Sequence, residues 1–365
     1  MSSDHSIPPG GTIGILGGGQ LGRMTALAAA QLGYRVHIFT PEQDSPASHV
    51  SDGVTIAAYE DEAALDRFAR QVDVVTLEFE NIPASPVRFL SERVPVRPGP
   101  RVLEIAQDRL AEKRFFNELG IKTAPWREVK SAGDLEAAFG EIGAPCVLKT
   151  ARLGYDGKGQ AKITSAADLA GAWAGLGTNL GILEGFISFD CEVSALVARG
   201  LDGSWAAWDV VQNVHTNHIL DTTSAPALLS QPVLDQAVAI AHRAAEALDL
   251  VGVLAVEMFL TRDGRLLVNE MAPRPHNSGH WTIDACLTSQ FEQVVRAVCG
   301  LPLGTPKRHS DAVMTNLIGD MAEAWESYLH EPNAKLHLYG KAERRQGRKM
   351  GHVTRLYPLG RRPHS

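Results

Sequence analysis

The chain has 365 residues, 44% of them hydrophobic and 21% charged, which is typical of a folded protein with room for two or three domains. Its formal charge of −7, from 35 Lys and Arg against 42 Asp and Glu, excludes a general attraction to nucleic acid or to an anionic membrane. The four widely spaced cysteines fit neither a disulfide framework nor a zinc site, so a reducing cytoplasm is the expected compartment.

The N-terminal region alternates strand and helix signals. Met1–Gly11 is polar and does not resemble a signal peptide, and no stretch approaches the roughly 20 apolar residues of a membrane span. Strands that alternate with helices predict βαβ units and a parallel sheet. The expected strands are Thr12–Leu16, Arg35–Phe39 and Val72–Phe79, the expected helices are Leu21–Leu32 and Glu62–Arg70, and Arg97–Pro100 is the expected linker.

After the linker the pattern predicts an α+β arrangement. Val102–Leu119 reads as one charged amphipathic helix, and short strands with one Ala-rich helix then indicate a small α+β unit. The expected elements of this unit are Cys146–Thr150, Gln160–Thr164, Ile182–Phe186 and the helix Ala166–Leu176. Further along we expect two strands within residues 192–210, strands at Val251–Leu260 and Arg265–Met271, helices at Pro232–Leu248 and Ser289–Val298, and a turn-rich tail with short strands.

The first glycine-rich loop lies between a strand and a helix. Gly17, Gly19 and Gly22 form G-x-G-x-x-G, which allows a tight turn and presents free N–H groups at a helix start. A dinucleotide site also needs an acid after the second strand, but Thr40 stands there and Glu42 follows a proline. Three interpretations stay open: an NAD(P) site, another phosphate ligand, or tight strand–helix packing.

A second glycine-rich loop, Gly154–Gln160, differs from a P-loop. Gln160 stands where a P-loop has Ser or Thr, and a strand follows the loop instead of a helix. The loop therefore reads as a flap on a hairpin, whose N–H groups and Lys158 could cover a triphosphate. Lys149, at the end of the preceding strand, is either a phosphate ligand or a lysine that reaches solvent from a strand end.

Asp-Gly between two apolar runs predicts a hairpin. A turn centred on Asp263-Gly264 places Glu257 directly opposite Glu270, with Val256 and Met271 as the next pair on the apolar face. Opposed carboxylates among apolar residues repel each other and lose solvation, and a divalent cation such as Mg²⁺ relieves both costs. The alternative is a pair of glutamates facing solvent at a sheet edge.

Two polar runs follow the hairpin. Arg274, His276, Asn277 and His280 could hold a substrate anion next to the γ-phosphate, or they could form an ordinary loop that caps a helix. Late in the chain, residues 347–352 place Arg348 and Lys349 between glycines, which suits either a phosphate site or a solvated basic turn.

Four of these motifs, in this order, resemble one enzyme family. They are Gly-Gln-Leu-Gly-Arg-Met at 19–24, Gly-Tyr-Asp-Gly-Lys-Gly-Gln at 154–160, Asn-Glu-Met-Ala-Pro-Arg-Pro-His-Asn-Ser-Gly-His at 269–280 and Gly-Arg-Lys-Met-Gly-His at 347–352. The chain is similar, from about Thr12 to His352, to the 5-(carboxyamino)imidazole ribonucleotide synthases (PurK type) of the ATP-grasp superfamily. The resemblance implies that ATP phosphorylates bicarbonate and that the amine of 5-aminoimidazole ribonucleotide takes up the carboxyl group, a step of de novo purine synthesis.

The resemblance also implies site residues. Those expected to bind ATP are Arg109, Lys149, Gly154, Tyr155, Asp156, Gly157, Lys158, Gly159, Gln160, Glu184, Gly185, Phe186, Ile187, Glu192, His215, Asn269 and Glu270. Glu257 and Glu270 would bind Mg²⁺, with Mn²⁺ as an alternative, and Arg274, His276 and Asn277 would hold bicarbonate or carboxyphosphate as the catalytic residues. Those expected to contact the ribonucleotide are Gln20, Glu80 (or Glu78 in its place), Tyr155, Asp156, Arg348 and Lys349.

In domain terms the resemblance implies a mixed α/β and α+β chain. Residues 1–100 would form a Rossmann-like domain, 101–300 an ATP-grasp domain with a flap-bearing subdomain at about 120–187, and 301–365 a β-rich domain. The last of these is expected to be shortened, because the family usually continues with a helix where this chain has only 353–365. A cytoplasmic homodimer is expected, with neither nucleic acid nor membrane as a partner. The rival functions are a formate-dependent glycinamide ribonucleotide transformylase, an NAD(P)-dependent oxidoreductase and an inactive nucleotide-binding regulator.

Overall fold

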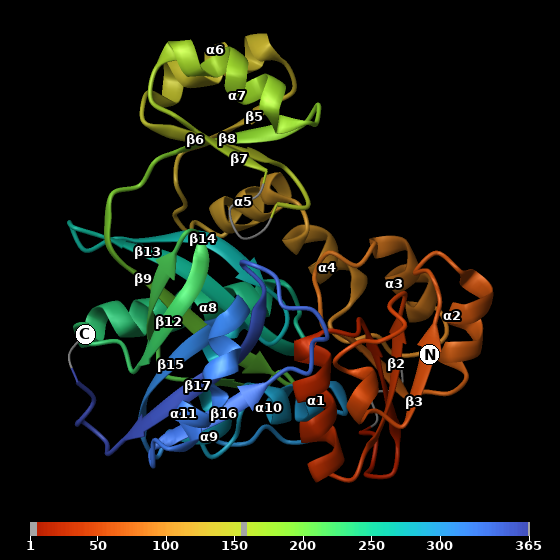
Figure 1. The fold of residues 1–365 in the computed structure, drawn as a ribbon. Coiled ribbons are helices and arrows are strands. Elements are labelled where there is room, and N and C mark those ends of the chain that lie inside the picture. Colours follow the sequence, from red (N-terminus) through yellow and green to blue (C-terminus); the bar gives the residue numbers. More distant parts are fainter. Residues whose placement is uncertain (1–5, 155–158, 364–365) are drawn as a thin grey trace.

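The structure is a computed structural model that describes residues 6–154 and 159–363, folded around three β-sheets (Figure 1). Figure 1 shows a parallel N-terminal sheet on one side, a large sheet beside it and a small sheet at the top. The helix α5 (Arg109–Glu118) lies between the small and the large sheet. Within the described part of the chain, no helix has the length and apolar composition of a membrane span.

The N-terminal sheet is parallel, as the alternating pattern predicts. Its order is β3-β2-β1-β4, from β1 (Thr12–Leu16), β2 (Arg35–Thr40), β3 (Gly53–Ile56) and β4 (Val74–Leu77). Alternate side chains of β1, β2 and β4 pack on opposite faces, against α1 (Gln20–Gln31) or against α2 (Glu62–Ala69) and α3 (Ala84–Ser91). The sequence pattern missed β3, whose side chains are half-buried or exposed, and it also missed α3.

The small sheet is antiparallel, with the order β5-β8-β6-β7. Its strands are β5 (Trp126–Val129), β6 (Cys146–Thr150), β7 (Gln160–Ile163) and β8 (Gly181–Gly185), and α6 (Ala132–Ile142) and α7 (Leu169–Leu176) complete its core. The pattern missed α6 because Gly133 and Gly140 weaken a helix signal. The side chain of Ser131 nevertheless caps this helix by accepting a hydrogen bond from the N–H of Asp134.

The large sheet has nine strands and two cores. Helix α8 (Gln231–Ala247) packs with Leu254 and Val256 on one face, and α10 (Gln290–Val298) packs with Val253 and Ala255 on the other. Its order is β14-β13-β9-β11-β12-β15-β17-β16, with β10 paired to β9. The strands are β9 (Phe189–Arg199), β10 (Trp205–Ala207), β11 (Val211–Thr216), β12 (Ile219–Ala225), β13 (Gly252–Thr261), β14 (Leu266–Ala272), β15 (Asp311–Ile318), β16 (Ala334–Leu338) and β17 (Lys349–Tyr357), and the short helices are α9 (Thr282–Ala285) and α11 (Trp325–Leu329).

The prediction of one helix over Val102–Leu119 is wrong. The segment forms α4 (Pro100–Ala106) and α5, separated at Asp108, whose backbone is extended. The Asp108 carboxylate accepts hydrogen bonds from the N–H groups of Leu110 and Ala111, so it starts a second helix. This break places Arg109 and its neighbours in the first turns of α5.

Candidate active site

Glu257 and Glu270 are directly opposed on β13 and β14, as predicted. The predicted turn, however, is one residue too short: the loop has three residues instead of the two centred on Asp263-Gly264. The N–H of Thr261 donates to the carbonyl of Arg265 at 2.9 Å, which closes a three-residue loop. Gly264 takes the left-handed conformation of that loop, with φ of +79°.

A β-bulge restores the register between the turn and the two glutamates. Met258 pairs with Val268 while Glu257 pairs with Glu270, so Asn269 is an extra residue in β14. Val268 and Met271 both pack in the core beneath the sheet, although strict alternation would put them on opposite faces. The bulge therefore lets the neighbouring Asn269 and Glu270 both lie on the side away from that core.

The two carboxylates bring like charges together, with Glu257 largely buried and the Glu270 side chain 43% exposed. The Glu257 side chain is only 13% exposed, and Nε2 of His276 lies 3.5 Å from its Oε1. Burial and the charge of Glu270 raise the pKa of Glu257 to about 7. Nη1 of Arg109 lies 3.4 Å from Oε2 of Glu270. This donor set of two oxygen-bearing side chains fits Mg²⁺, which usually takes few protein ligands and completes its shell with phosphate and water.

A cation cluster surrounds Glu184 at the end of β8. Nζ of Lys149 donates to Oε2 of Glu184 at 3.0 Å, and Nζ of Lys113 lies 3.7 Å from the same oxygen. Burial alone would raise the pKa of Glu184, but Lys113 and Lys149 lower it to about 2. Among the described residues, Oε1 of Glu184 has no hydrogen-bond partner, so it can accept one from a ligand.

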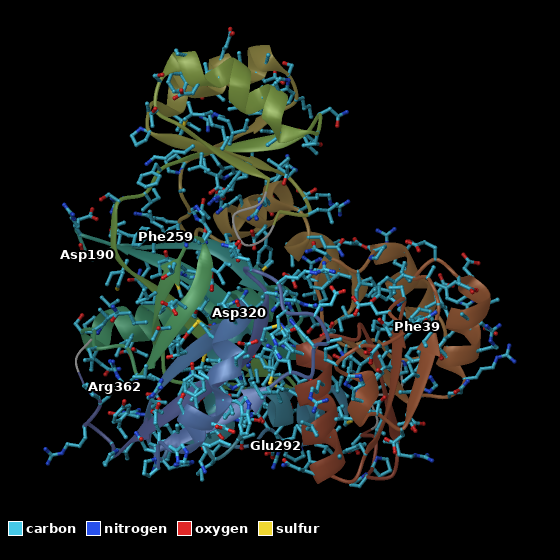
Figure 2. The ribbon with its side chains drawn as sticks, viewed as in Figure 1. Phe39, Asp190, Phe259, Glu292, Asp320 and Arg362 are labelled. Carbon is cyan, nitrogen blue, oxygen red and sulfur yellow. The ribbon has the colours of Figure 1, made fainter. Side chains whose placement is uncertain are left out.

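Other predicted nucleotide residues lie on the same sheets. Oε2 of Glu192 on β9 is 2.5 Å from Nδ1 of His215 on β11, and the charges of Glu257 and Glu270 act on this histidine. Phe259, labelled in Figure 2, follows Glu257 by two residues on β13 and stacks on Phe189 with ring centroids 4.7 Å apart. Strand alternation places Phe259 on the same face of β13 as Glu257, and the sequence analysis did not single it out.

Glu80 joins the N-terminal region to the run after β14. Its carboxylate accepts two hydrogen bonds from the Arg274 guanidinium, one from Nε and one from Nη2 at 2.7 Å. Burial would raise the pKa of Glu80, but the Arg274 charge outweighs it and the pKa is lowered. A predicted ribonucleotide ligand and a predicted bicarbonate ligand thus lie in direct contact.

The first glycine loop holds an internal carboxylate. Glu78 accepts hydrogen bonds from the N–H groups of Gly19 at 2.6 Å and Gly22 at 3.0 Å. A Cβ on Gly17 would lie 2.3 Å from Cγ of Glu78, and Gly17 has φ of +105°, so glycine is required there. Tight packing against Glu78 therefore explains these glycines.

Gln290 fixes the backbone of the segment that carries His276. Its Oε1 accepts from the N–H of His276 and its Nε2 donates to the carbonyl of His276, both at 2.8 Å. The amide of Asn277, by contrast, is buried and has no partner among the described residues on either its nitrogen or its oxygen. An unpartnered buried amide next to His276 is suited to receive a polar ligand.

Comparisons with known proteins agree with this arrangement. Family models match residues 11–107 (ribonucleotide synthetase preATP-grasp domain), 114–291 (ATP-grasp domain) and 312–358 (phosphoribosylaminoimidazole carboxylase C-terminal domain). The N5-carboxyaminoimidazole ribonucleotide synthase of Brucella melitensis is 52% identical over 97% of this chain and 98% of its own length. The chain belongs to the N5-carboxyaminoimidazole ribonucleotide synthase family. It is an ATP-grasp ligase, and the predicted fold, an ATP-grasp core with an N-terminal parallel sheet, is confirmed.

Two further members of the comparison extend the match. The bifunctional purine synthesis protein purC/E of Dictyostelium discoideum is 50% identical over 95% of this chain, but the chain spans only 37% of that protein. A crystal structure of the synthase from Aspergillus clavatus, in complex with ADP and 5-aminoimidazole ribonucleotide, superposes with a TM-score of 0.90 at 31% identity. That match covers 96% of this chain and 94% of the other.

In the present chain, the basic run at 347–352 lies beside Lys341, a lysine that the sequence analysis missed. Nζ of Lys341 donates to the carbonyl of Lys349 at 2.8 Å, and Nη1 of Arg348 donates to the carbonyl of Glu343 at 2.9 Å. Burial and the nearby Arg348 lower the pKa of Lys341 to about 8. The positive charge of Lys341 favours ionised Glu78, and that of Lys349 favours ionised Glu80. The basic run therefore lies near the segment that follows β4.

The remaining predicted site residues of the chain lie on several different elements. Gln20 starts α1, Gly159 and Gln160 lie at the start of β7, and the carbonyl of Gly154 accepts from Nη2 of Arg109 at 3.0 Å. Gly185 ends β8 and Phe186 follows it, and their N–H groups donate to the carbonyls of Pro125 and Pro145 respectively. Tyr155, Asp156, Gly157 and Lys158 lie outside the described residues.

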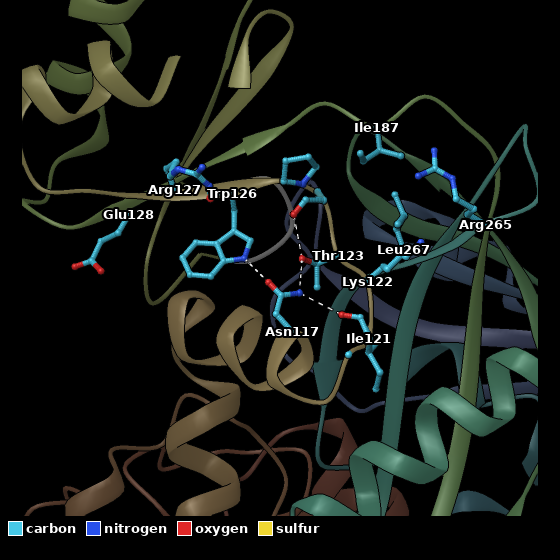
Figure 3. A pocket seen from close by; sticks show the side chains of 13 residues that line it. Asn117, Ile121, Lys122, Thr123, Trp126, Arg127, Glu128, Ile187, Arg265 and Leu267 are labelled. Atoms are coloured by element: carbon cyan, nitrogen blue, oxygen red, sulfur yellow. Dashed lines mark hydrogen bonds between the residues drawn. The ribbon is translucent and has the colours of Figure 1, made fainter. Parts of the chain in front are cut away.

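A cavity of about 760 Å³ lies between the small sheet and the hairpin, where Figure 3 shows Trp126 and Arg127 on one side and Ile187, Leu267 and Arg265 on the other. Of the predicted site residues that the structure describes, only Ile187 lines it. The opposed glutamates and Arg274 therefore do not belong to this cavity.

Proposed function

We infer that this chain carboxylates 5-aminoimidazole ribonucleotide to 5-(carboxyamino)imidazole ribonucleotide with ATP and bicarbonate, in de novo purine synthesis. The γ-phosphoryl group of ATP passes to a bicarbonate oxygen, which gives carboxyphosphate and ADP. The ribonucleotide amine then forms a C–N bond to the carboxyl carbon, and phosphate leaves. Family membership supports the reaction, and the observation that carries its assignment to this site is the opposed pair Glu257 and Glu270, with Arg274 four residues after Glu270.

Mg²⁺ is proposed as the cation of this site, with Glu257 and Glu270 as its protein ligands. The fit is supported by the raised pKa of Glu257, since a divalent cation would compensate a charge that burial and Glu270 disfavour. When bound, the ion would neutralise the charge of the β- and γ-phosphate oxygens. Mn²⁺ has the same preference for oxygen ligands and is an alternative.

ATP is proposed to lie between the small and the large sheet. Lys149 and Arg109 supply cations for its phosphates, and the unpartnered Oε1 of Glu184 supplies an acceptor at the end of β8. The other proposed ATP contacts are Gly154, Gly159, Gln160, Gly185, Phe186, Ile187, Glu192, His215 and Asn269, together with residues 155–158.

Bicarbonate and carboxyphosphate are assigned to Arg274, His276 and Asn277. The guanidinium carries the positive charge that an anion needs, and the free amide of Asn277 offers both a donor and an acceptor. Burial and the nearby Arg274 charge lower the pKa of His276, so a neutral imidazole faces the substrate. Gln290 fixes the position of this segment through its two hydrogen bonds to the His276 backbone.

The ribonucleotide is assigned to the space between the N-terminal loop and the basic run. Arg348 and Lys349 are cations for its 5′-phosphate, and the missed Lys341 joins them. Gln20 and Glu80 are the proposed contacts from the N-terminal domain, with Tyr155 and Asp156 from the flap. Glu80 is the proposed contact and Glu78 is its alternative: the Glu78 carboxylate accepts from Gly19 and Gly22, and the Glu80 carboxylate accepts from Arg274.

The division into residues 1–100, 101–300 and 301–365 stays a proposal, as does a cytoplasmic homodimer. Four unpaired cysteines suit a reducing compartment. Large apolar side chains exposed on and near α11, Met321, Trp325, Leu329 and Leu338, favour association of two copies.

The test is ATP hydrolysis by the full chain with bicarbonate, with and without 5-aminoimidazole ribonucleotide. We expect phosphate release to depend on the ribonucleotide, and a carboxylated product to accumulate in step with ADP. Formate with glycinamide ribonucleotide is the control pair, and turnover with that pair alone would assign the chain to the other ligase.

A further inference from the structure

Two side chains of α5, Glu112 and Lys113, contact the backbone of β14 on both sides of Glu270. Nζ of Lys113 donates to the carbonyl of Asn269 at 2.7 Å, and the N–H of Met271 donates to Oε1 of Glu112 at 2.6 Å. Both side chains are almost fully buried, with 1% and 2% of their surface exposed. We call this pair the α5 clamp.

The contacts of the α5 clamp fall on the bulge. Asn269 is the extra residue of β14, and β14 is the edge strand of the large sheet. On its outer side, β14 has one isolated bridge, where the N–H of Val268 donates to the carbonyl of Lys122 at 2.9 Å, and no further strand pairs there among the described residues. Beyond Val268 the outer carbonyl and N–H groups therefore have no strand to pair with, and a bulge in an edge strand can move along the strand or disappear. Hydrogen bonds to Asn269 and Met271 hold the bulge at one position.

The position of the bulge decides which face Glu270 occupies. Without it, alternation from Val268 would direct Glu270 toward the core and Met271 toward the ligand face. Lys113 also lies 3.7 Å from Glu184, so one ammonium contacts both the bulge and the cluster at the end of β8.

We infer that Glu112 and Lys113 are positioning residues, which fix the bulge at Asn269 and thereby set the geometry of the metal carboxylates. The inference rests on the proposed role of Glu257 and Glu270. The clamp does not touch the metal: it acts through the β14 backbone. Groups that support a metal ligand from behind change metal affinity by about 10–100-fold when they are removed.

The test measures Mn²⁺ binding to the full chain with saturating ADP, by electron paramagnetic resonance. K113M keeps the length of the side chain without its donor, and E112L removes the acceptor. We expect each to weaken Mn²⁺ binding about 10-fold or more. E112Q retains an acceptor oxygen and should bind Mn²⁺ as the wild type does. The same is expected of R114M, which is also on α5 and removes an exposed ion pair with Glu128 of β5.

Three outcomes separate the ideas. E270Q should lose Mn²⁺ binding, and wild-type binding by E270Q would overturn the metal site and leave the clamp without a role. Loss in E270Q with wild-type affinity in K113M and E112L would overturn the clamp alone. If K113M or E112L does not fold, hydrogen exchange in the wild type decides: the amide of Met271 should be protected, and fast exchange at this amide would contradict the contact with Glu112.

Discussion

Glu80 and Arg274 form a two-point ion pair between the N-terminal region and the segment that follows the hairpin of β13 and β14. Their side chains are 21% and 15% exposed, so water screens the pair only partly. A planar guanidinium matches a carboxylate through two parallel donors, and lysine cannot reproduce this geometry. The pair thus links the proposed ribonucleotide site to the proposed bicarbonate site.

We expect E80Q and R274K each to lower kcat/KM by about 10–100-fold. Either change breaks the two-point pair, so the side chain left without its partner shifts away from its position toward the substrate. The double variant should lose less than the two single losses multiplied, with a coupling free energy of about 0.5–3 kcal/mol. Steady-state kinetics with bicarbonate and ribonucleotide varied in turn measure this. Strictly multiplicative losses would mean that the pair does not couple the sites. The exposed pair Arg88 and Glu104 is the control, where R88K should change nothing.

Removing the charge of either proposed metal ligand, Glu257 or Glu270, should abolish turnover. E257Q and E270Q keep the size of the side chain and remove the charge that a divalent cation needs, so we expect kcat to fall by about 1,000-fold or more. Initial rates at saturating ATP and Mg²⁺ provide the measurement. E246Q, at an exposed position of α8, is the matched control. Full activity in E270Q would refute the metal assignment.

The opposition of these glutamates was predictable, but its local cause was not. The apolar runs and Asp263-Gly264 identify the hairpin from sequence alone. They do not reveal the three-residue loop or the bulge at Asn269. The loop shifts the strand pairing by one residue, and the bulge shifts it back by one, so Glu257 and Glu270 still end up opposite each other. The register depends on the α5 clamp, a contact across 156 residues that no local pattern encodes.

The same limit explains the other missed groups. Glu112 and Lys113 lie in a charged helix, and a charged helix is usually read as facing solvent. The glycine loop gives a phosphate-like signal whether its donors bind a ligand or, as here, Glu78. Motif order across the whole chain, by contrast, identifies the family, because it does not depend on the position of any single side chain.

Ribonucleotide binding should weaken above about pH 8. Burial and Arg348 lower the pKa of Lys341 to about 8, so its ammonium is present below this pH and is lost as the pH rises through it. If Lys341 pairs with the 5′-phosphate, KM for the ribonucleotide should rise by about 10-fold between pH 7 and 9.5, as expected for one lost charge-assisted hydrogen bond.

Two variants separate Lys341 from other groups that titrate in this range. K341R retains its charge throughout, so its KM should stay flat where that of the wild type rises. K341M should show a high KM at every pH. An identical pH dependence in K341M and in the wild type would show that a different group titrates.

Asn277 and Asn213 are both asparagines with buried amides, and their replacement by leucine should have opposite effects on stability. The Asn213 amide donates to Oγ of Ser194 at 2.6 Å and accepts from Oγ1 of Thr223 at 3.0 Å, whereas neither amide atom of Asn277 has a partner among the described residues. An unsatisfied buried polar group costs about 1–3 kcal/mol, which an apolar side chain of similar shape does not incur. N277L should therefore raise the free energy of unfolding, and N213L should lower it.

Activity should change in the opposite sense at Asn277. If its amide receives bicarbonate or carboxyphosphate, N277L loses bicarbonate-dependent turnover while the protein becomes more stable, which is the trade-off expected where a site is built for a ligand rather than for the fold. Urea unfolding of the ligand-free chain and initial rates on the same preparations test this together. A destabilised N277L would mean that the amide has a partner in solution, and a stable N277L with full activity would remove Asn277 from the catalytic residues.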